Sequence, residues 1–250
     1  MIDVAVTISP LRDKSGKVIG ACKLARDISV QNAQRKQISQ ALQDKTALLH
    51  EVHHRVKNNL QIVSSLLNMQ ARRASPEVAS AFSECQTKIR AMALVHQLLY
   101  ESGNMAEVDL ALYLSQLAML SHASYDDDQM AVAIQFDKPE RKILLDAQRA
   151  IPCGLIVSEL ILNAYKHAFI GTENATISIR LMNLDDLHFQ LIVADNGIGL
   201  PENFEWKSRK GLGTQLVPMF AQQLKAKLHH SSDANGSRFF FDIPTAVEEN

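Results

Sequence analysis

The feature that most constrains the fold is a run over residues 29–102 that contains no glycine and one proline, Pro76. A run of this length without turn residues is typical of long helices. Ser75 has a side chain that can cap a helix, and Pro76 then fits the first helical position. The sequence therefore predicts one helix over about residues 30–73 and a second over about residues 76–101.

Apolar side chains recur along the first helix at spacings of three and four residues, the pattern of a helix-bundle seam. They are Leu49, Val52, Val56, Leu60, Val63 and Leu67. Two helices joined by a short link form an antiparallel hairpin, which leaves part of its apolar surface uncovered. A second copy of the chain covers that surface in a four-helix bundle, so we expect a homodimer. Gly103 is expected to end the second helix.

Residues 1–30 have the pattern of strand, turn and strand. Val4, Val6 and Ile8 alternate along the first strand, and residues 13–16 have turn chemistry. Two strands alone are only marginally stable in water. We therefore expect this hairpin to be the end of a larger domain.

Beyond residue 105 the pattern becomes a mixture of helix and strand. Strand candidates with β-branched or alternating apolar residues cover residues 131–136, 175–181, 187–194 and 239–243. A strong helix candidate, residues 146–169, lies between the first two strands. The predicted fold class is therefore α+β, with a short β-hairpin, a long helical hairpin and a mixed α/β domain.

Composition excludes several classes of protein. Lys and Arg number 26 against 27 Asp and Glu, a net charge of −1, which argues against a nucleic-acid binder held by bulk charge. With 46% hydrophobic residues the chain is not mainly disordered. The three cysteines are far apart and suggest neither disulfides nor a zinc site. The most apolar segment, residues 151–170, contains charged side chains and no signal peptide is evident, so we expect a cytoplasmic protein without a membrane span.

Three of the nine histidines, His50, His53 and His54, lie in one five-residue stretch of the first long helix. From the centre of the apolar seam of an ideal helix, His53 lies at roughly 60°, His50 at roughly 120° and His54 at roughly 160°. His54 is therefore expected to face solvent and His53 to flank the core. The cluster is interpreted either as ordinary surface residues or as a nucleophile, His54, whose neutral imidazole attacks phosphorus. A metal site at His50 and His54 is the weaker alternative, because no third ligand lies nearby.

Four of the ten glycines form two short runs, Gly197 with Gly199 and Gly211 with Gly213. Glycines let backbone N–H groups approach a ligand closely. A helix that begins near Thr214 would offer its N-terminus to phosphate. The two runs together therefore indicate a phosphate-binding loop region more strongly than either run alone.

The helix predicted over residues 146–169 carries Glu159, Asn163, Lys166 and His167 at helical spacing, so these side chains are expected to share one face. The face is interpreted either as simply solvated or as chemical. As chemistry, the Asn163 carbonyl oxygen can bind a hard cation such as Mg²⁺ and Lys166 can neutralise phosphate charge. Glu159 can orient or deprotonate a nucleophile.

Three sets of these motifs, the histidine cluster, the helix with Asn163 and the glycine runs, resemble one known family. Residues 51–61, which read EVHHRVKNNLQ, closely resemble the H-box of sensor histidine kinases of the HHRVKNNLQ subclass. Residues 158–169, which read SELILNAYKHAF, resemble the N-box of that family, and the glycine runs resemble its G1 and G2 boxes. Residues 1–30 look like the last hairpin of a PAS sensor domain. The motifs occur in the family's order and cover nearly the whole chain.

The resemblance implies a truncated PAS domain over residues 1–30, a dimeric helical hairpin for histidine phosphotransfer over residues 31–104, and a Bergerat-type α/β sandwich that binds ATP over residues 105–250. It implies that His54 is the phosphoacceptor and that Glu159 assists catalysis at the γ-phosphate. The remaining implied ATP-site residues are Asn163 as the Mg²⁺ ligand, Asp195 for the adenine amino group, Gly197, Gly199, Gly211 and Gly213 in the lid, and Lys166, His167 and Thr214 near the phosphates.

The predicted function is that of an ATP-dependent protein histidine kinase with Mg²⁺ as its cofactor. It would phosphorylate His54 and pass the phosphoryl group to an aspartate of a separate response regulator. One alternative is an ATP-binding dimeric scaffold that transfers no phosphate. Serine kinases or anti-sigma factors with the same ATP fold, and ATPases of the chaperone or mismatch-repair kind, are disfavoured because residues 30–102 carry an H-box on a helical hairpin.

Overall fold

The computed structural model describes residues 2–102, 106–125, 131–201, 204 and 212–245. The chain divides into two compact units, residues 1–51 and residues 52–250. Within the described residues, the longest and most apolar helices still fall short of what a membrane span requires.

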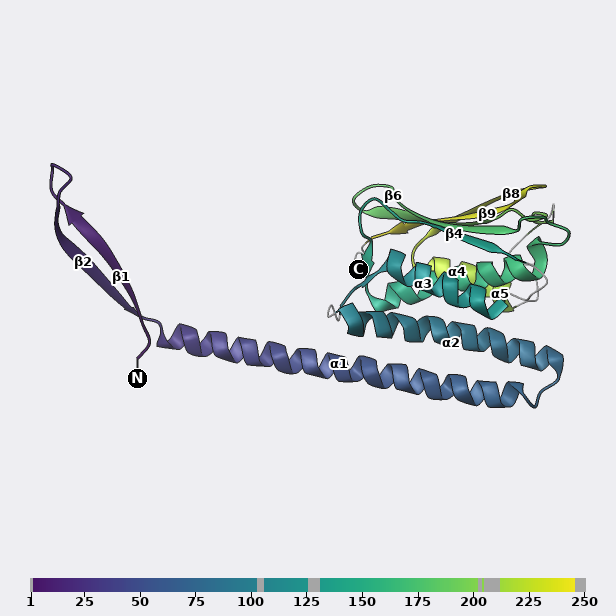
Figure 1. Cartoon of the computed structure of the whole chain (residues 1–250), viewed down its shortest axis with the longest axis horizontal. Coiled ribbons are helices and arrows are strands. Elements are labelled where there is room, and N and C mark those ends of the chain that lie inside the picture. The colour runs from purple at the N-terminus through teal and green to yellow at the C-terminus, as the bar shows by residue number, and fades with distance from the viewer. Residues whose placement is uncertain (1, 103–105, 126–130, 202–203, 205–211, 246–250) are drawn as a thin grey trace. The chain divides into compact units, whose positions relative to one another are not determined.

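The first unit contains an antiparallel β-hairpin and the first part of a long helix (Figure 1). The strands are β1 (Val4–Arg12) and β2 (Val18–Asp27). The Asp13 carboxylate closes the turn between them by accepting hydrogen bonds from the backbone N–H groups of Ser15 and Lys17. The predicted N-terminal hairpin is therefore confirmed, and nearly all of its residues are exposed within this unit.

Two long helices follow the hairpin, as the glycine-free run predicts. Helix α1 (Ser29–Ala71) continues from the first unit into the second, and α2 (Pro76–Ser102) runs back antiparallel to it (Figure 1). The backbone N–H of Ala79 donates to the Ser75 carbonyl, so the second helix begins where the serine and proline place it. Gly103, the expected end of this helix, lies outside the described residues.

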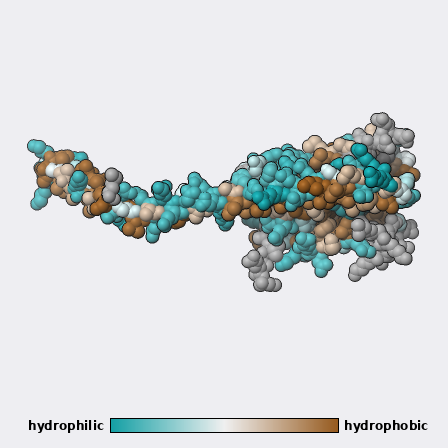
Figure 2. Space-filling view, turned by 90° about the horizontal axis from the view of Figure 1, so that it is seen from below, coloured by the Kyte–Doolittle hydropathy of each residue, from teal (hydrophilic) through white to brown (hydrophobic). Residues whose placement is uncertain are grey.

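The predicted apolar seam of α1 is only partly covered by α2. Val52 is 53% exposed and Val63 is 44% exposed, and Leu66 one turn further is 51% exposed. Figure 2, which faces the helical hairpin from below, shows brown hydrophobic side chains along it. Exposed apolar stripes of this kind mark interaction surfaces.

The rest of the second unit is a two-layer α/β sandwich with one mixed sheet. The sheet has the order β4-β6-β7-β9-β8, in which β4 and β6 are parallel and the other neighbours are antiparallel. Its strands are β4 (Ala133–Asp137), β6 (Thr176–Asn183), β7 (His188–Asp195), β8 (Lys227–Asp233) and β9 (Gly236–Pro244). Two further short strands, β3 (Val108–Asp109) and β5 (Leu144–Leu145), pair with each other.

One face of the sheet packs on a layer of helices, with α2 beneath them (Figure 1). These helices are α3 (Leu110–Tyr125), α4 (Ala147–Asn163) and α5 (Leu212–Gln223), and α4 continues into a π-helical turn, η1 (Ala164–Ala168). The α+β fold class is thus confirmed. Strand β8 was not predicted, because its sequence KLHHSSD lacks the apolar alternation of a half-buried strand and its residues are mostly exposed.

The second half of α2 belongs to the hydrophobic core of the sandwich. Ala91, Val95 and Leu99 are almost completely buried, in one cluster with side chains of α4 and of the sheet. Tyr113 of α3 crosses this contact and donates from its hydroxyl to the Ala91 carbonyl at 3.2 Å. Helix α2 therefore has two neighbours, α1 on one side and the sandwich on the other.

Candidate functional site

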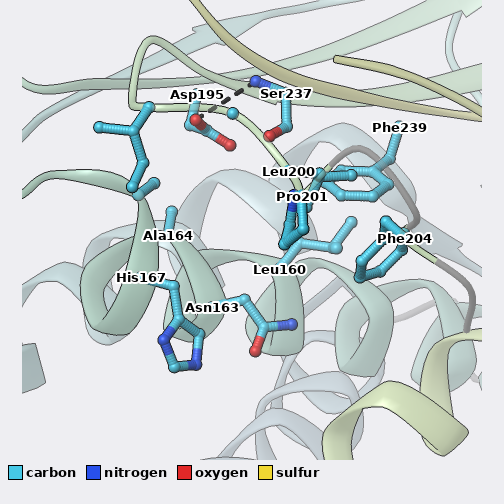
Figure 3. A pocket seen from close by; sticks show the side chains of 13 residues that line it. Leu160, Asn163, Ala164, His167, Asp195, Leu200, Pro201, Phe204, Ser237 and Phe239 are labelled. Atoms are coloured by element: carbon cyan, nitrogen blue, oxygen red, sulfur yellow. Dashed lines mark hydrogen bonds between the residues drawn. The ribbon is translucent and has the colours of Figure 1, made fainter. Parts of the chain in front are cut away.

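A cavity of about 410 Å³ opens between the sheet and the helix formed by α4 and η1. This volume lies within the range of small-molecule sites, roughly 300–1,000 Å³. Its apolar walls are formed by Leu160, Ala164, Ala168, Ile198, Leu200, Pro201, Phe204 and Phe239. Its polar lining consists of Asn163, His167, Asp195, Gly199 and Ser237 (Figure 3). The cavity therefore has mainly apolar walls and a few polar groups at defined places.

Asp195 ends strand β7 and presents a half-buried carboxylate to the cavity. Its Oδ1 accepts hydrogen bonds from the backbone N–H of Gly197 at 3.0 Å and of Ser237 at 3.3 Å, and Figure 3 shows the second of these. Burial raises the pKa of the Asp195 carboxyl, and these backbone N–H groups partly oppose the shift. Because both bonds go to Oδ1, they fix the orientation of the carboxylate and do not involve Oδ2.

The loop after β7 passes so close to neighbouring backbone that glycine is required twice. A Cβ atom on Gly197 would lie 2.3 Å from the Ala168 carbonyl oxygen, and the next residue, Ile198, donates its N–H to that same oxygen. Gly199 has φ +76°, and a Cβ there would lie 2.2 Å from the Asp233 carbonyl oxygen. Both glycines of the predicted first run thus hold the loop at the mouth of the cavity.

Helix α4 presents two different sides. Asp146 caps its start by accepting from the Arg149 N–H, and the π-helical turn η1 follows at Ala164, a feature common at functional sites. Asn163 and His167 line the cavity, as expected. Glu159 and Lys166 do not lie among the cavity-lining residues of the described chain, although we expected all four on one face.

The reason is angular. Asn163 lies about 40° to one side of Glu159 around an ideal α-helix, and the π-helical turn that begins at Ala164 gives Lys166 and His167 directions different from those in a continuous α-helix. The helix sits between the cavity and α2, so this difference sends the two pairs to different neighbours.

The side away from the cavity forms two ion pairs with α2. Lys88 Nζ lies 3.2 Å from Glu159 Oε2, and Glu84 pairs with Lys166. Glu159 is only 4% exposed, and within the described part of the chain neither Lys88 Nζ nor Glu159 Oε2 has a hydrogen-bond partner of good geometry. A buried ion pair without supporting hydrogen bonds is costly to desolvate. Glu159 can therefore exchange Lys88 for another partner at a small net cost in free energy.

The histidine cluster lies on α1. His53 and His54 belong to the second unit, and His50 belongs to the first. His54 is exposed and His53 is buried, which confirms the exposures expected from the helical geometry. The side-chain amide of Asn58, one turn later, lies 3.3 Å from His54 Nδ1. Since the neutral imidazole has one donor and one acceptor nitrogen, a partner at Nδ1 determines the proton state of Nε2.

Of the segment that contains the two glycine runs, Gly211 and residues 202–203 and 205–210 lie outside the described residues. Gly213 and Thr214 lie in the first turn of α5, which begins at Leu212, close to the expected start. No group of three or more His, Cys, Asp and Glu side chains that could hold a metal ion occurs among the described residues.

Sequence reasoning did not identify Ser237 and Phe239, which line the cavity from strand β9. They reach it because β9 pairs with β7 in a register that places Ser237 opposite Asp195. Strand pairing between segments about 40 residues apart is a long-range property. The alternation of apolar residues in β9 indicated the strand, but no local signal indicated its partner.

Comparison with protein families gives two matches along this chain. Residues 51–125 match the family described as "Histidine kinase" (HisKA_2). Residues 149–247 match the family described as "Histidine kinase-, DNA gyrase B-, and HSP90-like ATPase" (HATPase_c). The first segment covers the histidine cluster and α2, and the second covers the cavity.

Among curated proteins, the sensor histidine kinase PdtaS of Mycolicibacterium smegmatis is 32% identical over 92% of this chain and 43% of its own length. PdtaS of Mycobacterium tuberculosis is 32% identical over 81% of this chain and 39% of its own length. The chain thus spans less than half the length of these relatives. Blue-light-activated histidine kinase 2 of Erythrobacter litoralis is 27% identical over 97% of this chain and 68% of its own length.

Among solved structures, the histidine kinase domain of the Erythrobacter litoralis EL346 blue-light activated histidine kinase is similar to this chain, with a TM-score of 0.60 at 24% identity. The similarity covers 81% of this chain and 94% of that domain. At this identity the similarity shows the fold alone, a helical hairpin followed by an α/β sandwich.

Proposed function

Because this chain belongs to the sensor histidine kinases of the HisKA_2 type, with an ATPase domain of the gyrase B and HSP90 class, we propose that it phosphorylates itself on His54. The phosphoryl group then passes to an aspartate of a separate response regulator. The single observation that carries the proposal is that one chain combines an exposed histidine on a rigid helix with a cavity suited to a nucleotide.

The cavity residues fit ATP. Leu160, Ile198 and Phe239 supply apolar surface for a flat purine ring, and Asp195 is held by Gly197 and Ser237 so that Oδ2 can accept the adenine amino group. The loop at Gly199 leaves no room for a side chain and lets backbone approach the ligand. Gly211, Gly213 and Thr214 are proposed to complete this region near the phosphates.

Asn163 is the proposed Mg²⁺ ligand, with His167 one turn later beside the phosphates. Mg²⁺ in nucleotide sites binds one or two protein groups together with phosphate oxygens, and it neutralises charge on the phosphates. An amide oxygen in the cavity lining therefore suffices, and no cluster of carboxylates is needed.

In the transfer step, one imidazole nitrogen of His54 bonds to the γ-phosphorus as the bond to the β-phosphate oxygen breaks, and ADP leaves. Asn58 Nδ2 faces His54 Nδ1 and donates to it, so Nε2 carries the ring proton in this arrangement; Nε2 becomes the attacking atom when that proton is on Nδ1 and the Asn58 amide turns its oxygen toward it. Glu159 orients the imidazole, and its carboxylate offsets the positive charge that the ring gains as its nitrogen bonds to phosphorus, while Lys166 offsets the negative charge of the phosphates.

Glu159 and Lys166 are engaged by Lys88 and Glu84 in the present arrangement. Transfer therefore requires both side chains to exchange their α2 partners for His54 and the phosphates. We infer that this arrangement is one in which nucleotide can bind before transfer begins.

The exposed stripe at Val52, Val63 and Leu66 is the proposed homodimer contact. A Val63→Glu substitution places a charge in that contact and is expected to weaken the dimer by about tenfold or more, since unpaired charges at such interfaces cost several kcal/mol. Sedimentation measures the change. A dimer of unchanged affinity would contradict this contact.

Residues 1–30 are proposed to be the last hairpin of a PAS sensor domain, in keeping with their exposed apolar residues.

The proposed function is tested by incubating the purified chain with γ-labelled Mg-ATP. Label that is labile to acid, stable to alkali and lost in His54→Gln but not in His50→Gln would support a phosphohistidine at His54. His50 lies one turn earlier on the same helix and is the matched control. Nucleotide binding without label would favour the non-phosphorylating scaffold, and label that persists in His54→Gln would contradict His54 as the acceptor.

A further inference from the structure

His53 is the one buried residue of helix α1, all of whose residues the structure describes. It is 9% exposed, although it stands next to the exposed His54 and one turn from Lys57. A histidine is a poor choice for burial unless its ring nitrogens find partners. The partner of His53 is therefore informative.

That partner is His96 of α2. The two Nδ1 atoms are 2.9 Å apart, with ring centroids 5.2 Å apart and rings tilted by 42°. A hydrogen bond between two Nδ1 atoms requires that one ring carries a proton there and the other offers a lone pair. The bond therefore couples the proton states of both rings, and it cannot form when both rings are fully protonated.

His96 also connects to the sandwich. Val95 before it and Leu98 and Leu99 after it are buried in the hydrophobic core that α2 shares with α4 and the sheet. The backbone of α2 at His96 is therefore fixed by the ATPase half of the molecule. The bond between His96 and His53 therefore holds α1, the helix that carries the proposed phosphoacceptor, in a defined position relative to α2.

The consequence for His54 is rotational. Consecutive residues of an α-helix point about 100° apart, so the direction of the His53 side chain determines that of His54. Much of the surrounding α1 surface is half-exposed, and Val52 is 53% exposed, so apolar packing constrains this rotation only weakly. A second bond, from Gln86 Nε2 to the Ser64 carbonyl at 3.1 Å, lies about three turns away.

We propose that His96 is a positioning residue for phosphoryl transfer, which holds His53 and thereby sets the rotation of α1 that presents His54. This inference rests on the proposed function. His96 does not touch the nucleotide or the phosphoryl group. It acts indirectly, because His96 orients His53 and the direction of His53 determines that of the adjacent His54.

The electrostatic setting supports a neutral pair. Burial and the facing His53 ring lower the pKa of His96. The other titratable or charged groups one turn from the pair are His50 and Lys57 on α1 and Tyr100 on α2. Because the pKa of His96 is lowered in the fold, His96 is neutral at neutral pH and the bond is present; the bond is lost when the pH falls far enough that both rings are protonated.

The test compares three variants of the full chain. His96→Leu removes the bond and keeps the bulk, while His96→Asn places an amide near the position of Nδ1 and does not titrate. Gln97→Leu is the matched control, because Gln97 is the next residue of α2, is also half-buried and donates to Glu101 of its own helix. Labelling rates from γ-labelled Mg-ATP and separate ATP-binding curves are measured for each.

His96→Leu is expected to slow labelling of His54 by about tenfold or more with unchanged ATP affinity, since small misplacement of a reacting group can cost up to about a hundredfold. His96→Asn is expected to restore most of the rate and to lose less of it at acid pH than the native chain. Nitrogen NMR of the native chain should show the two rings as opposite Nδ1 tautomers.

Three results would overturn the inference alone, and the first two are native labelling in His96→Leu and equal losses in His96→Leu and His96→Asn. An equal loss in Gln97→Leu would do the same, because it would reduce the effect to helix packing. A native chain that binds ATP and takes no label would instead overturn the proposed function, and this inference with it.

Discussion

The two sides of the helix formed by α4 and η1 make different kinds of contact. On the cavity side, Asn163 and His167 line an open space whose other walls come from the sandwich itself. On the side that faces α2, Glu159 and Lys166 are bound to Lys88 and Glu84.

The difference separates two functions. The residues proposed to bind the base, among them Asp195, are held by backbone groups of their own domain, so that end of the site is formed in advance. The residues proposed to act in transfer are held by another element and must be released. Changes on the cavity side should therefore alter nucleotide affinity, and changes on the α2 side should alter the rate of transfer.

The largest effect on affinity is expected from Asp195→Asn. The N–H groups of Gly197 and Ser237 both point at Oδ1, so the amide oxygen of the variant turns toward them and its NH₂ group faces the cavity. Donor then meets donor at the adenine amino group, and ATP affinity should fall by about a hundredfold, the upper end of the roughly 1.5–3 kcal/mol of a charge-assisted hydrogen bond. Calorimetric titration measures this.

The same variant should lose its preference for ATP over GTP, because the 6-oxo group of guanine accepts from the new NH₂ group. Asp137→Asn, at the exposed edge strand β4, is the control and should bind ATP normally. Undiminished ATP binding by Asp195→Asn would show that the base does not lie against this carboxylate.

A smaller loss, about tenfold in ATP affinity, is expected from Gly199→Ala. The substitution combines a left-handed backbone with a Cβ atom 2.2 Å from the Asp233 carbonyl oxygen, so the loop at the cavity must move. Gly171→Ala is the matched control, since Gly171 has φ +72° and open space around its missing Cβ. Both variants should lose roughly 1–3 kcal/mol of stability to backbone strain, but only Gly199→Ala should lose affinity.

As the pH falls, ATP affinity should begin to decrease at a higher pH than it would if an exposed aspartate bound the base. Burial raises the pKa of Asp195, and an amino group that donates to the carboxylate favours its ionised form. Affinity is therefore full at neutral pH and lost as the pH falls through the raised pKa. Asp195→Asn should remove this part of the pH dependence of affinity.

The stability of the free protein should respond to Asp195 in the opposite direction. A carboxyl whose pKa is higher in the fold than in the unfolded chain binds its proton more tightly when folded, so its protonation favours the fold as the pH falls. Denaturant titrations of the native chain and of Asp195→Asn at several pH values measure this contribution. Equal pH profiles would indicate an unperturbed carboxyl.

Much of this fold follows from local sequence signals. The absence of glycine over residues 29–102 and the Ser75-Pro76 step predicted both long helices within about two residues of their ends, because helix termini depend on local caps. The exposures of His53 and His54 also followed, since the helical repeat fixes their relative directions.

What the sequence did not reveal depends on neighbours distant along the chain. The spacing of Glu159, Asn163 and Lys166 predicted a shared face, but only the position of α2 decides that Glu159 and Lys166 turn away from the cavity. The partner of His53 was hidden for the same reason, because His96 lies 43 residues away. Local patterns specify directions on a helix, and the packing of elements decides what those directions meet.

The separation of binding from transfer is tested most directly by Lys88→Met, with Lys227→Met on the exposed strand β8 as the control. The substitution removes the α2 partner of Glu159 and leaves its buried carboxylate unpaired, so α2 holds Glu159 less tightly. ATP affinity and the rate of His54 labelling are measured on the same preparation. The account predicts affinity within about twofold of the native chain and labelling several-fold faster. A fall in affinity with an unchanged labelling rate would contradict it.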